Sequence, residues 1–428
     1  MWLEFIKTLN HSIASFFQRK FDPITCFINN DKHQIMREEK AIELGLDIYT
    51  FLSQINEYPK AFIEHKKKIQ HIAIGSLLNF NSIPIIHSYN TPKLFGGTDF
   101  STRNYTNWRG VPTTLYFLPK IELKITQNSV DYTLNRLEHT KPYSLAAIKV
   151  KSQLQDYNYL TKSNTPNSKE WHTSICKVKE SIDNTSLKKV VLARRTSFTF
   201  KTKKCPYDLL KKLENEHKFC FQFSHSLSFF GSSPEMLYER SDRWLKTVAI
   251  AGTYSRGISQ KEDKLSEKKL RESIKNHDEF MYVKDWIKNK LTPICKQLNI
   301  SGKKQLILKS IRHNYSYFNG ILSDFKNDKE LIHLLHPTPA VGGFPSISAL
   351  KHQFTSESFD RGWYAPPIGW ISYQSAFQIV AIRSALLSEC NLDIFAGVGI
   401  IKNSIANKEW EELELKINQF KTIIMQGN

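Results

Sequence analysis

The sequence has few cysteines, no long apolar run and no internal repeat. Its six cysteines, spread over 428 residues, include no Cys-x-x-Cys pair. This argues against a disulfide framework or a zinc site and favours a reducing compartment. No segment approaches the roughly 18–20 apolar residues that cross a bilayer, and the amphipathic start does not resemble a secretion signal. We therefore expect a cytoplasmic protein without a membrane partner, and neither a solenoid nor a propeller.

Acidic residues are in the minority, with 41 Asp and Glu against 60 Lys and Arg, and the formal net charge is +19. Such an excess is compatible with nucleic-acid binding. However, the lysines are spread along the whole length, and the sequence has no zinc finger, RNP-like string or arginine-rich tract. We interpret the charge as a solvated surface that helps to steer a small dianion, and expect no nucleic-acid partner.

A chain of this length can form two or three ordinary domains or one large one. Residues 1–90 are interpreted as a mostly helical entry segment of the same fold, and residues 91–428 as the main domain, with its core at 169–424. The polar stretch 153–169 is typical of a linker. Helices are expected at 169–183, 265–292 and 407–424, with strands at 189–255 and 305–401. Few regular βαβ units are present, which favours an α+β fold with large antiparallel sheets in a sandwich and helices packed outside.

Two residues of the central segment are candidates for acid–base chemistry. Lys189 begins a β-branched run, and in a strand it would share a face with Val191 and Ala193. A lysine partly removed from water can lose its proton near neutral pH and act as a base. Glu235 ends a Gly-Ser-Ser-Pro-Glu turn, where a carboxyl group shielded from water can donate a proton. A charged strand end and a glutamate at a helix start are the plain alternatives.

Other residues suit an anionic ligand. Gly252 and Thr253 follow a short apolar strand, and a glycine turn there lets backbone amides approach a carboxylate closely, although an ordinary hairpin turn fits equally well. Arg383 stands within an apolar strand, and a buried guanidinium requires an anion. Weaker candidates for contacts with the same ligand are Tyr364, Gly397 and Gly399.

Acidic residues on two expected helices suggest a metal site. Glu279 lies beside the apolar stripe of the helix at 265–292, while Glu409, Glu412 and Lys416 share one face of the last helix. Carboxylates that meet at one point from two helices are the ligands that Mg²⁺ prefers. A solvated Glu/Lys helix surface has the same spacing.

In this order the motifs are similar to those of the chorismate-utilising enzymes, and the chain most closely resembles the isochorismate synthases of that family. The resemblance is strong from about 169 to 420 and weaker from 94 to 120. The matching strings are Lys189-Val-Val-Leu-Ala-Arg, Phe230-Gly-Ser-Ser-Pro-Glu, Ile250-Ala-Gly-Thr-Tyr-Ser-Arg-Gly, Lys275-Asn276 with Glu279, His336-Pro-Thr-Pro-Ala-Val-Gly-Gly-Phe-Pro, Arg361-Gly-Trp-Tyr-Ala-Pro-Pro-Ile-Gly-Trp, Ile382-Arg-Ser-Ala, Gly397-Val-Gly and Glu409-Trp-Glu-Glu.

Three positions distinguish the reactions of this family. Relatives that use ammonia usually have glutamine in place of Lys189, so the lysine implies water as the nucleophile. Ala251 stands where aminodeoxychorismate synthases often carry a nucleophilic lysine, and Ala340 stands where salicylate synthases and ammonia users tend to have threonine. The resemblance therefore implies an isochorismate synthase, an isomerase. The alternative is a salicylate synthase, which adds a pyruvate lyase step. A non-catalytic nucleic-acid binder would leave these residues without a purpose.

The resemblance also implies a role for each residue. Lys189 would deprotonate a water that attacks C2 of chorismate, and Glu235 would protonate the departing C4 hydroxyl. Mg²⁺ would bind through Glu279, Glu409 and Glu412. The residues expected to contact the substrate are Gly252, Thr253, His313, Ala340, Tyr364, Arg383, Gly397, Gly399 and Lys416. The product would feed menaquinone or siderophore biosynthesis, and family members are often monomers.

Two residues depart from the family pattern near the expected pyruvyl arm of the substrate. Pro366 stands where glycine is usual, and Val398 replaces the common alanine between two glycines. The contacts to that arm are therefore the least determined part of the expected pocket.

Overall fold

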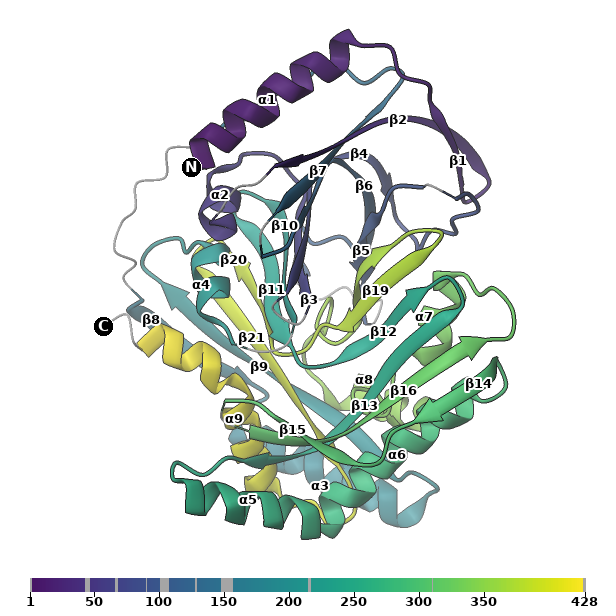
Figure 1. Cartoon of the computed structure of the whole chain (residues 1–428). Coiled ribbons are helices and arrows are strands. Elements are labelled where there is room, and N and C mark those ends of the chain that lie inside the picture. The colour runs from purple at the N-terminus through teal and green to yellow at the C-terminus, as the bar shows by residue number, and fades with distance from the viewer. Residues whose placement is uncertain are drawn as a thin grey trace.

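The protein is described by a computed structural model. It covers residues 2–42, 47–65, 68–89, 91–100, 108–127, 129–147, 157–214, 217–309 and 311–425. The helices are α1 (Trp2–Gln18), α2 (Ile48–Gln54), α3 (Ser168–Asn184), α4 (Pro206–Lys212), α5 (Gln260–Glu272), α6 (Ile274–Leu291), α7 (Asp328–Leu335), α8 (Ser346–Ser356) and α9 (Ala406–Met425). Helix α1 lies at one end of the molecule, while α3, α5, α6 and α9 gather at the other (Figure 1). None of the helices in the described ranges has the length and apolar character needed to cross a bilayer.

The strands form two antiparallel layers that share one strand. The first layer runs, edge to edge, through β8 (Tyr159–Thr165), β9 (Lys189–Phe200), β21 (Asn391–Ile400), β20 (Ser384–Ser388), β11 (Leu227–Ser233), β10 (His217–Ser224), β3 (Lys60–His65), β4 (Ile69–Phe80), β6 (Thr114–Ile125), β7 (Val130–Leu137), β2 (Asp31–Ile42) and β1 (Ile24–Ile28). The two-residue strand β17 (Gly343–Phe344) pairs with the start of β9.

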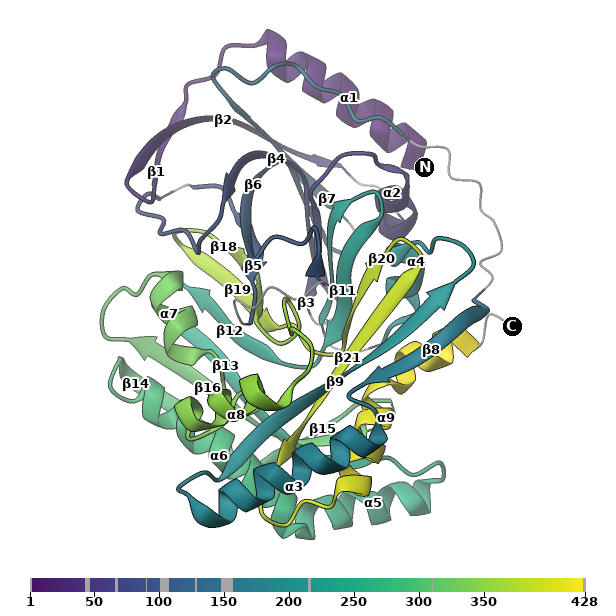
Figure 2. The ribbon, with the colours of Figure 1, turned by 180° about the vertical axis from the view of Figure 1, so that it is seen from behind.

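The second layer branches from β6. It runs through β5 (Leu94–Thr98), β18 (Pro367–Ile371), β19 (Ser375–Val380), β12 (Met236–Ser241), β13 (Trp244–Ser255) and β16 (Ile311–Leu322), with β14 (Cys295–Ile300) and β15 (Lys304–Ile307) both on the far edge of β16. Helix α9 packs on β21 of the first layer, and α6 packs on β13 and β16 of the second. Seen from behind, α3 and α8 lie near the lower part of β9 (Figure 2). The expected α+β sandwich of antiparallel sheets is confirmed.

Several elements agree with the sequence patterns. Strand β9 begins at Lys189, and α3 and α9 cover the expected helices. Helix α3 begins with a capping box, in which the Asn167 side chain accepts from Glu170 N and the Glu170 side chain accepts from Asn167 N. This box accounts for the sharp helix start after the polar stretch.

Three expectations were wrong. The first 90 residues are not mostly helical, because β1 to β4 lie there. The charged sequence of β2 has little strand propensity, but its pairing with both β1 and β7 overrides that.

The expected linker contains strand β8, and the expected single helix at 265–292 is two helices. Ser273 ends α5 and caps α6, where its side chain accepts from Asn276 N, so the chain turns at that residue.

Candidate active site

A cavity lies where β13 and β16 of the second layer face β9 and β21 of the first. Most of the predicted site residues line it. They are Glu235, Gly252, Thr253, Glu279, His313, Ala340, Tyr364, Arg383, Gly397 and Lys416. Because these residues come from segments up to 181 positions apart (416 − 235), only the tertiary fold brings them together.

Glu235 lies in the short connection between β11 and β12. Its backbone N–H donates to Ser233 Oγ at 3.1 Å, and its carbonyl accepts from Val380 N at 3.0 Å. Burial raises the pKa of the side chain to about 7, against the opposing influence of Lys189, a hydrogen bond with Thr338, and Lys416. The chain continues into a strand, so the helix-start alternative is wrong. A carboxyl group with this pKa can hold and donate a proton near neutral pH.

Lys189 is fully buried at the first position of β9, so the exposed strand end is wrong as an alternative. Its Nζ lies 3.0 Å from Glu279 Oε1 and has no well-aligned hydrogen-bond partner among the described residues. Gly399 makes room for this contact, since a Cβ there would lie 2.5 Å from both Lys189 Cε and Glu279 Oε1. Lys189 itself does not line the cavity but lies beside the carboxylate that does. It is close enough to lower the pKa of Glu235.

Arg383 supplies a buried positive charge to the cavity wall. It does not lie within a strand, as expected, but in the connection between β19 and β20, with a φ of 54°. Of the apolar neighbours that suggested a strand, Ala381 and Ala385 are buried and Ile382 is partly buried. Its Nη1 donates to the Lys416 carbonyl at 3.2 Å, and it forms no ion pair with any described residue. Burial lowers its pKa to about 10, so the guanidinium remains charged at neutral pH and suits an anionic ligand.

Tyr364 and Gly397 lie opposite each other in the same part of the cavity. A Cβ on Gly397 would lie 2.8 Å from the Tyr364 hydroxyl, so only glycine leaves that space open. The Gly397 carbonyl accepts from Lys416 Nζ at 2.7 Å. Gly397 is therefore required because the Tyr364 side chain lies close to its backbone, and it also lines the cavity.

Gly252 lies within β13 at a β-bulge, where the register with β16 shifts, rather than in a turn after the strand. Its φ of +74° and the 2.7 Å from an added Cβ to the Asn276 carbonyl both require glycine. Beyond the bulge, Thr253 Oγ1 lies 3.1 Å from His313 Nδ1. Burial, with Arg383 and Lys416, lowers the pKa of His313 to about 3, so the ring is neutral. Its Nε2 is buried without a partner among the described residues and can bond a ligand oxygen.

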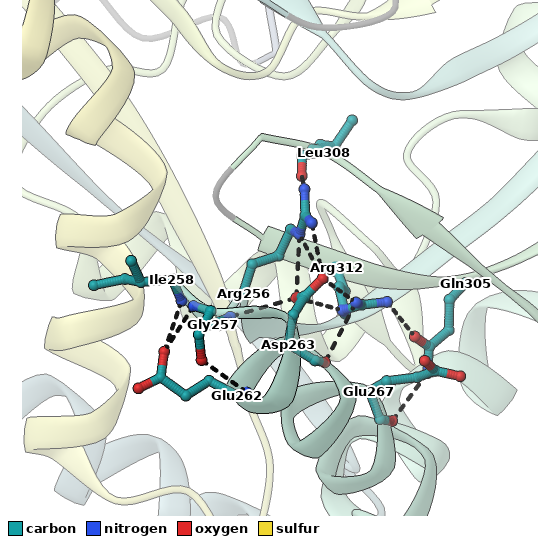
Figure 3. A network of polar contacts seen from close by, with 10 residues as sticks. Arg256, Gly257, Ile258, Glu262, Asp263, Glu267, Gln305, Leu308 and Arg312 are labelled. Atoms are coloured by element: carbon teal, nitrogen blue, oxygen red, sulfur yellow. Dashed lines mark hydrogen bonds and ion pairs between the residues drawn. The ribbon is translucent and has the colours of Figure 1, made fainter.

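A network on α5 fixes the ends of β13 and β16 (Figure 3). Asp263 lies between Arg256, at 2.7 Å, and Arg312, at 2.6 Å. Hydrogen bonds from Arg256 and then Arg312 hold the pKa of Asp263 well below its usual range. Because Arg312 precedes His313 and Arg256 follows β13, this contact holds the strand ends that carry the cavity residues.

Three carboxylates from two helices act electrostatically on the same lysine, Lys275. Glu279 extends from α6, and Glu409 and Glu412 from α9. Lys275 Nζ lies 2.6 Å from Glu409 Oε1 and 3.9 Å from Glu412 Oε2, and Lys416 Nζ lies 2.9 Å from Glu412 Oε1. Burial lowers the pKa of Lys275, but Glu412, Glu409 and Glu279 together raise it above its usual range. Glu409 is only 1% exposed, so these acids are not a solvated helix surface.

The donor chemistry of this cluster suits Mg²⁺, which prefers hard, anionic oxygen ligands. Glu409 Oε2 is also buried without a hydrogen-bond partner among the described residues. In the described ranges, however, no three or more His, Cys, Asp or Glu side chains are gathered closely enough to hold a metal ion. The predicted ligands are therefore brought to one region, but lysines are their partners in this arrangement.

Sequence reasoning assigned no role to Arg361, which also lines the cavity. Arg361 is buried and pairs with Glu357 at 2.5 Å, while its Nη1 and Nη2 donate to the carbonyls of Val341 and Val191. It thereby joins the loop that carries Ala340 to strand β9. Glu357 is the C-cap of α8 and Arg361 lies beyond the helix, so helical spacing gave no signal for this pair.

Comparison with known proteins gives consistent results. The sequence pattern of the family described as chorismate binding enzymes matches residues 15–425. The chain is 31% identical over 372 residues to the chloroplastic isochorismate synthase of Catharanthus roseus, covering 80% of this chain but only 64%, less than two thirds, of that protein. It is 30% identical over 332 residues to the isochorismate synthase MenF of Pasteurella multocida, covering 73% and 77%. The fold matches the menaquinone-specific isochorismate synthase MenF of Escherichia coli with a TM-score of 0.83, at 22% identity, over 98% and 99% of the two chains.

Proposed function

Because this chain belongs to the family of chorismate-binding enzymes, we propose that it is an isochorismate synthase, which moves a hydroxyl group from C4 to C2 of chorismate. The observation that carries the proposal is the cavity in which a carboxyl group with a pKa of about 7 lies near a fully buried lysine. Relatives named as isochorismate synthases, at about the 30% identity level, support the same reaction.

In the proposed reaction, Lys189 accepts a proton from the water that attacks C2. The ring double bonds shift, and Glu235 gives its proton to the C4 hydroxyl, which leaves as water. One water is thus consumed and one released, so the reaction is an isomerisation. General acid–base catalysis by each such group contributes about 10²–10⁴ in rate. After the reaction the lysine holds the proton that the glutamic acid has lost, and the two groups must exchange it before the next turnover.

The carboxylates of the substrate would bind at two places. Arg383, which has no ion-pair partner among the described residues, suits the pyruvyl carboxylate, together with the Tyr364 hydroxyl. The ring carboxylate would lie near the Gly252–Thr253 bulge. Neutral His313 would contribute its unpartnered Nε2 as a hydrogen-bonding group.

We further propose that Mg²⁺ is the cofactor, held through Glu279, Glu409 and Glu412. When bound, it would neutralise the ring carboxylate and help to orient it. The protein itself contributes the buried cavity wall, which limits the access of bulk water, and it fixes the positions of Lys189 and Glu235. The names of the MenF relatives support menaquinone biosynthesis as the pathway, and six free cysteines suit a reducing cytoplasm.

The proposal is tested by incubating the purified protein with chorismate and Mg²⁺ and resolving the products by chromatography. We expect isochorismate without pyruvate. Salicylate together with pyruvate would identify the alternative salicylate synthase reaction. No turnover, under conditions in which a known isochorismate synthase is active, would reject the enzymatic assignment.

A further inference from the structure

We propose that Lys275 is a built-in competitor of the divalent cation. Its ammonium group lies beside Glu409 and Glu412, where Glu279 also acts on it electrostatically, and it must withdraw when the cation binds. Lys275 thereby sets how tightly the protein holds its metal. This inference rests on the proposed metal site.

The geometry places the Lys275 ammonium group beside the two acids of α9. Lys275 Nζ lies 2.6 Å from Glu409 Oε1 and 3.9 Å from Glu412 Oε2, and Glu279 also acts on it electrostatically. Glu409 and Glu412 on α9 therefore share Lys275 of α6, while Glu412 is also paired with Lys416, and Glu279 with Lys189. A cation that binds the same carboxylate oxygens cannot do so while the ammonium group stays in place.

Of the three lysines beside these acids, Lys275 is the one that can leave. Its side chain is 26% exposed, whereas that of Lys189 is 0% exposed. Lys416 is held by a second bond, from its Nζ to the Gly397 carbonyl at 2.7 Å. Lys275 makes no such second bond to the backbone in the described part of the chain, so its ammonium group can move into water once the acids are taken by another cation.

The backbone beneath Lys275 is fixed, so the exchange requires only a side-chain movement. The Asn276 carbonyl accepts from Asn314 Nδ2 at 3.2 Å, and Ser273 Oγ accepts from Asn276 N at the same distance. The first turn of α6 is thus attached to β16 and to its own cap. Glu279, one turn further along α6, keeps its position whether or not Lys275 has moved.

Replacing the ammonium group by an apolar side chain should favour the metal. Lys275→Met retains most of the length of the side chain without its charge. We expect it to bind Mg²⁺ at least about tenfold more tightly than the wild type, because the ammonium charge lies 2.6 Å from Glu409 and 3.9 Å from Glu412 and interacts strongly with both. If Lys275 instead held the acids together in readiness for the metal, the same substitution would weaken binding.

The experiment is calorimetric titration of Mg²⁺ into the full-length protein without chorismate, so that turnover plays no part in the readout. Lys275→Arg keeps a positive charge and should bind Mg²⁺ about as weakly as the wild type does. Lys288→Met is the matched control, because Lys288 is exposed on the same helix and contacts none of the three acids. It should leave the affinity unchanged.

Tighter Mg²⁺ binding by Lys275→Met alone supports the inference. Equal or weaker binding by Lys275→Met overturns it, as does a wild-type protein that binds no Mg²⁺ at all. Failure of the proposed function is a separate result, since it would appear as absent isochorismate formation in a protein whose Mg²⁺ titrations still rank the variants as expected.

Discussion

The two ends of the site differ in how their buried charges are balanced: Arg383 and His313 line the cavity, whereas Glu409 and Glu412 lie outside its lining. At the first end, the Arg383 guanidinium has no ion-pair partner and His313 Nε2 has no hydrogen-bond partner among the described residues. At the second end, Glu279, Glu409 and Glu412 each lie beside a lysine. We call these the open end and the paired end.

The difference bears on how each end meets a ligand. A buried polar group without a partner costs free energy, and a ligand that supplies the partner recovers it. The open end is therefore arranged in advance for an anion. At the paired end, Lys275 and Lys416 already partner Glu409 and Glu412, so a cation that binds these acids must compete with an ammonium group. Substitution of Arg383 should consequently weaken the binding of an anion at the open end. Removal of the Lys275 ammonium group should instead strengthen the binding of a cation at the paired end.

The largest effect is expected for Glu235→Gln, beside the open end. Glutamine keeps the volume of the side chain but cannot protonate the leaving hydroxyl, so isochorismate formation should fall by about 10²–10⁴. Below pH 7 the thermal midpoint should stay close to that of the wild type, because a neutral amide replaces a carboxyl group that is mostly protonated below its pKa of about 7. Near-wild-type turnover in a folded Glu235→Gln protein would show that another group is the acid.

Arg383→Met should have the next largest effect, through substrate binding. A hydrogen bond to a charged group contributes about 1.5–3 kcal/mol, which corresponds to a loss in kcat/KM of roughly 10- to 100-fold. The loss should appear mainly in KM. Arg271→Met, on the exposed last turn of α5, is the control and should change neither constant. An unchanged KM for Arg383→Met would remove the guanidinium from the binding site.

How far the sequence predicts this contrast depends on the range of the interactions. Lys189 at the start of a strand and Glu412 on the last helix follow from local patterns. The pairing of Lys275 with Glu409 joins residues 134 positions apart, and no local pattern contains it. The positive φ of Arg383 was missed for a similar reason, since its apolar neighbours have the composition of a strand and only the packing of β19 and β20 makes the chain turn there.

The pH dependence provides a test with a smaller expected effect. Burial raises the pKa of Glu235 to about 7, so the protonated acid dominates below that pH and disappears above it. The kcat/KM for chorismate should therefore fall as pH rises above 7, by up to about tenfold per unit. Residual activity of Glu235→Gln should lack this decline. A wild-type profile that stays flat from pH 7 to 9 would contradict the raised pKa of the acid.

The smallest effect is expected for Ala340→Thr, which alters the cavity wall near the acid without removing a charge. Ala340 lines the cavity, and its N–H donates to Thr338 Oγ1 at 3.3 Å, while Thr338 also hydrogen-bonds Glu235. A threonine adds a methyl and a hydroxyl group to a partly exposed position of the cavity wall, where they take space from the substrate, so we expect a several-fold slower formation of isochorismate. Product analysis by chromatography measures both the rate and any pyruvate released. An unchanged rate would mean that position 340 does not distinguish this reaction from those of its relatives, and that the lysine at position 189 and the alanine at position 251 must do so.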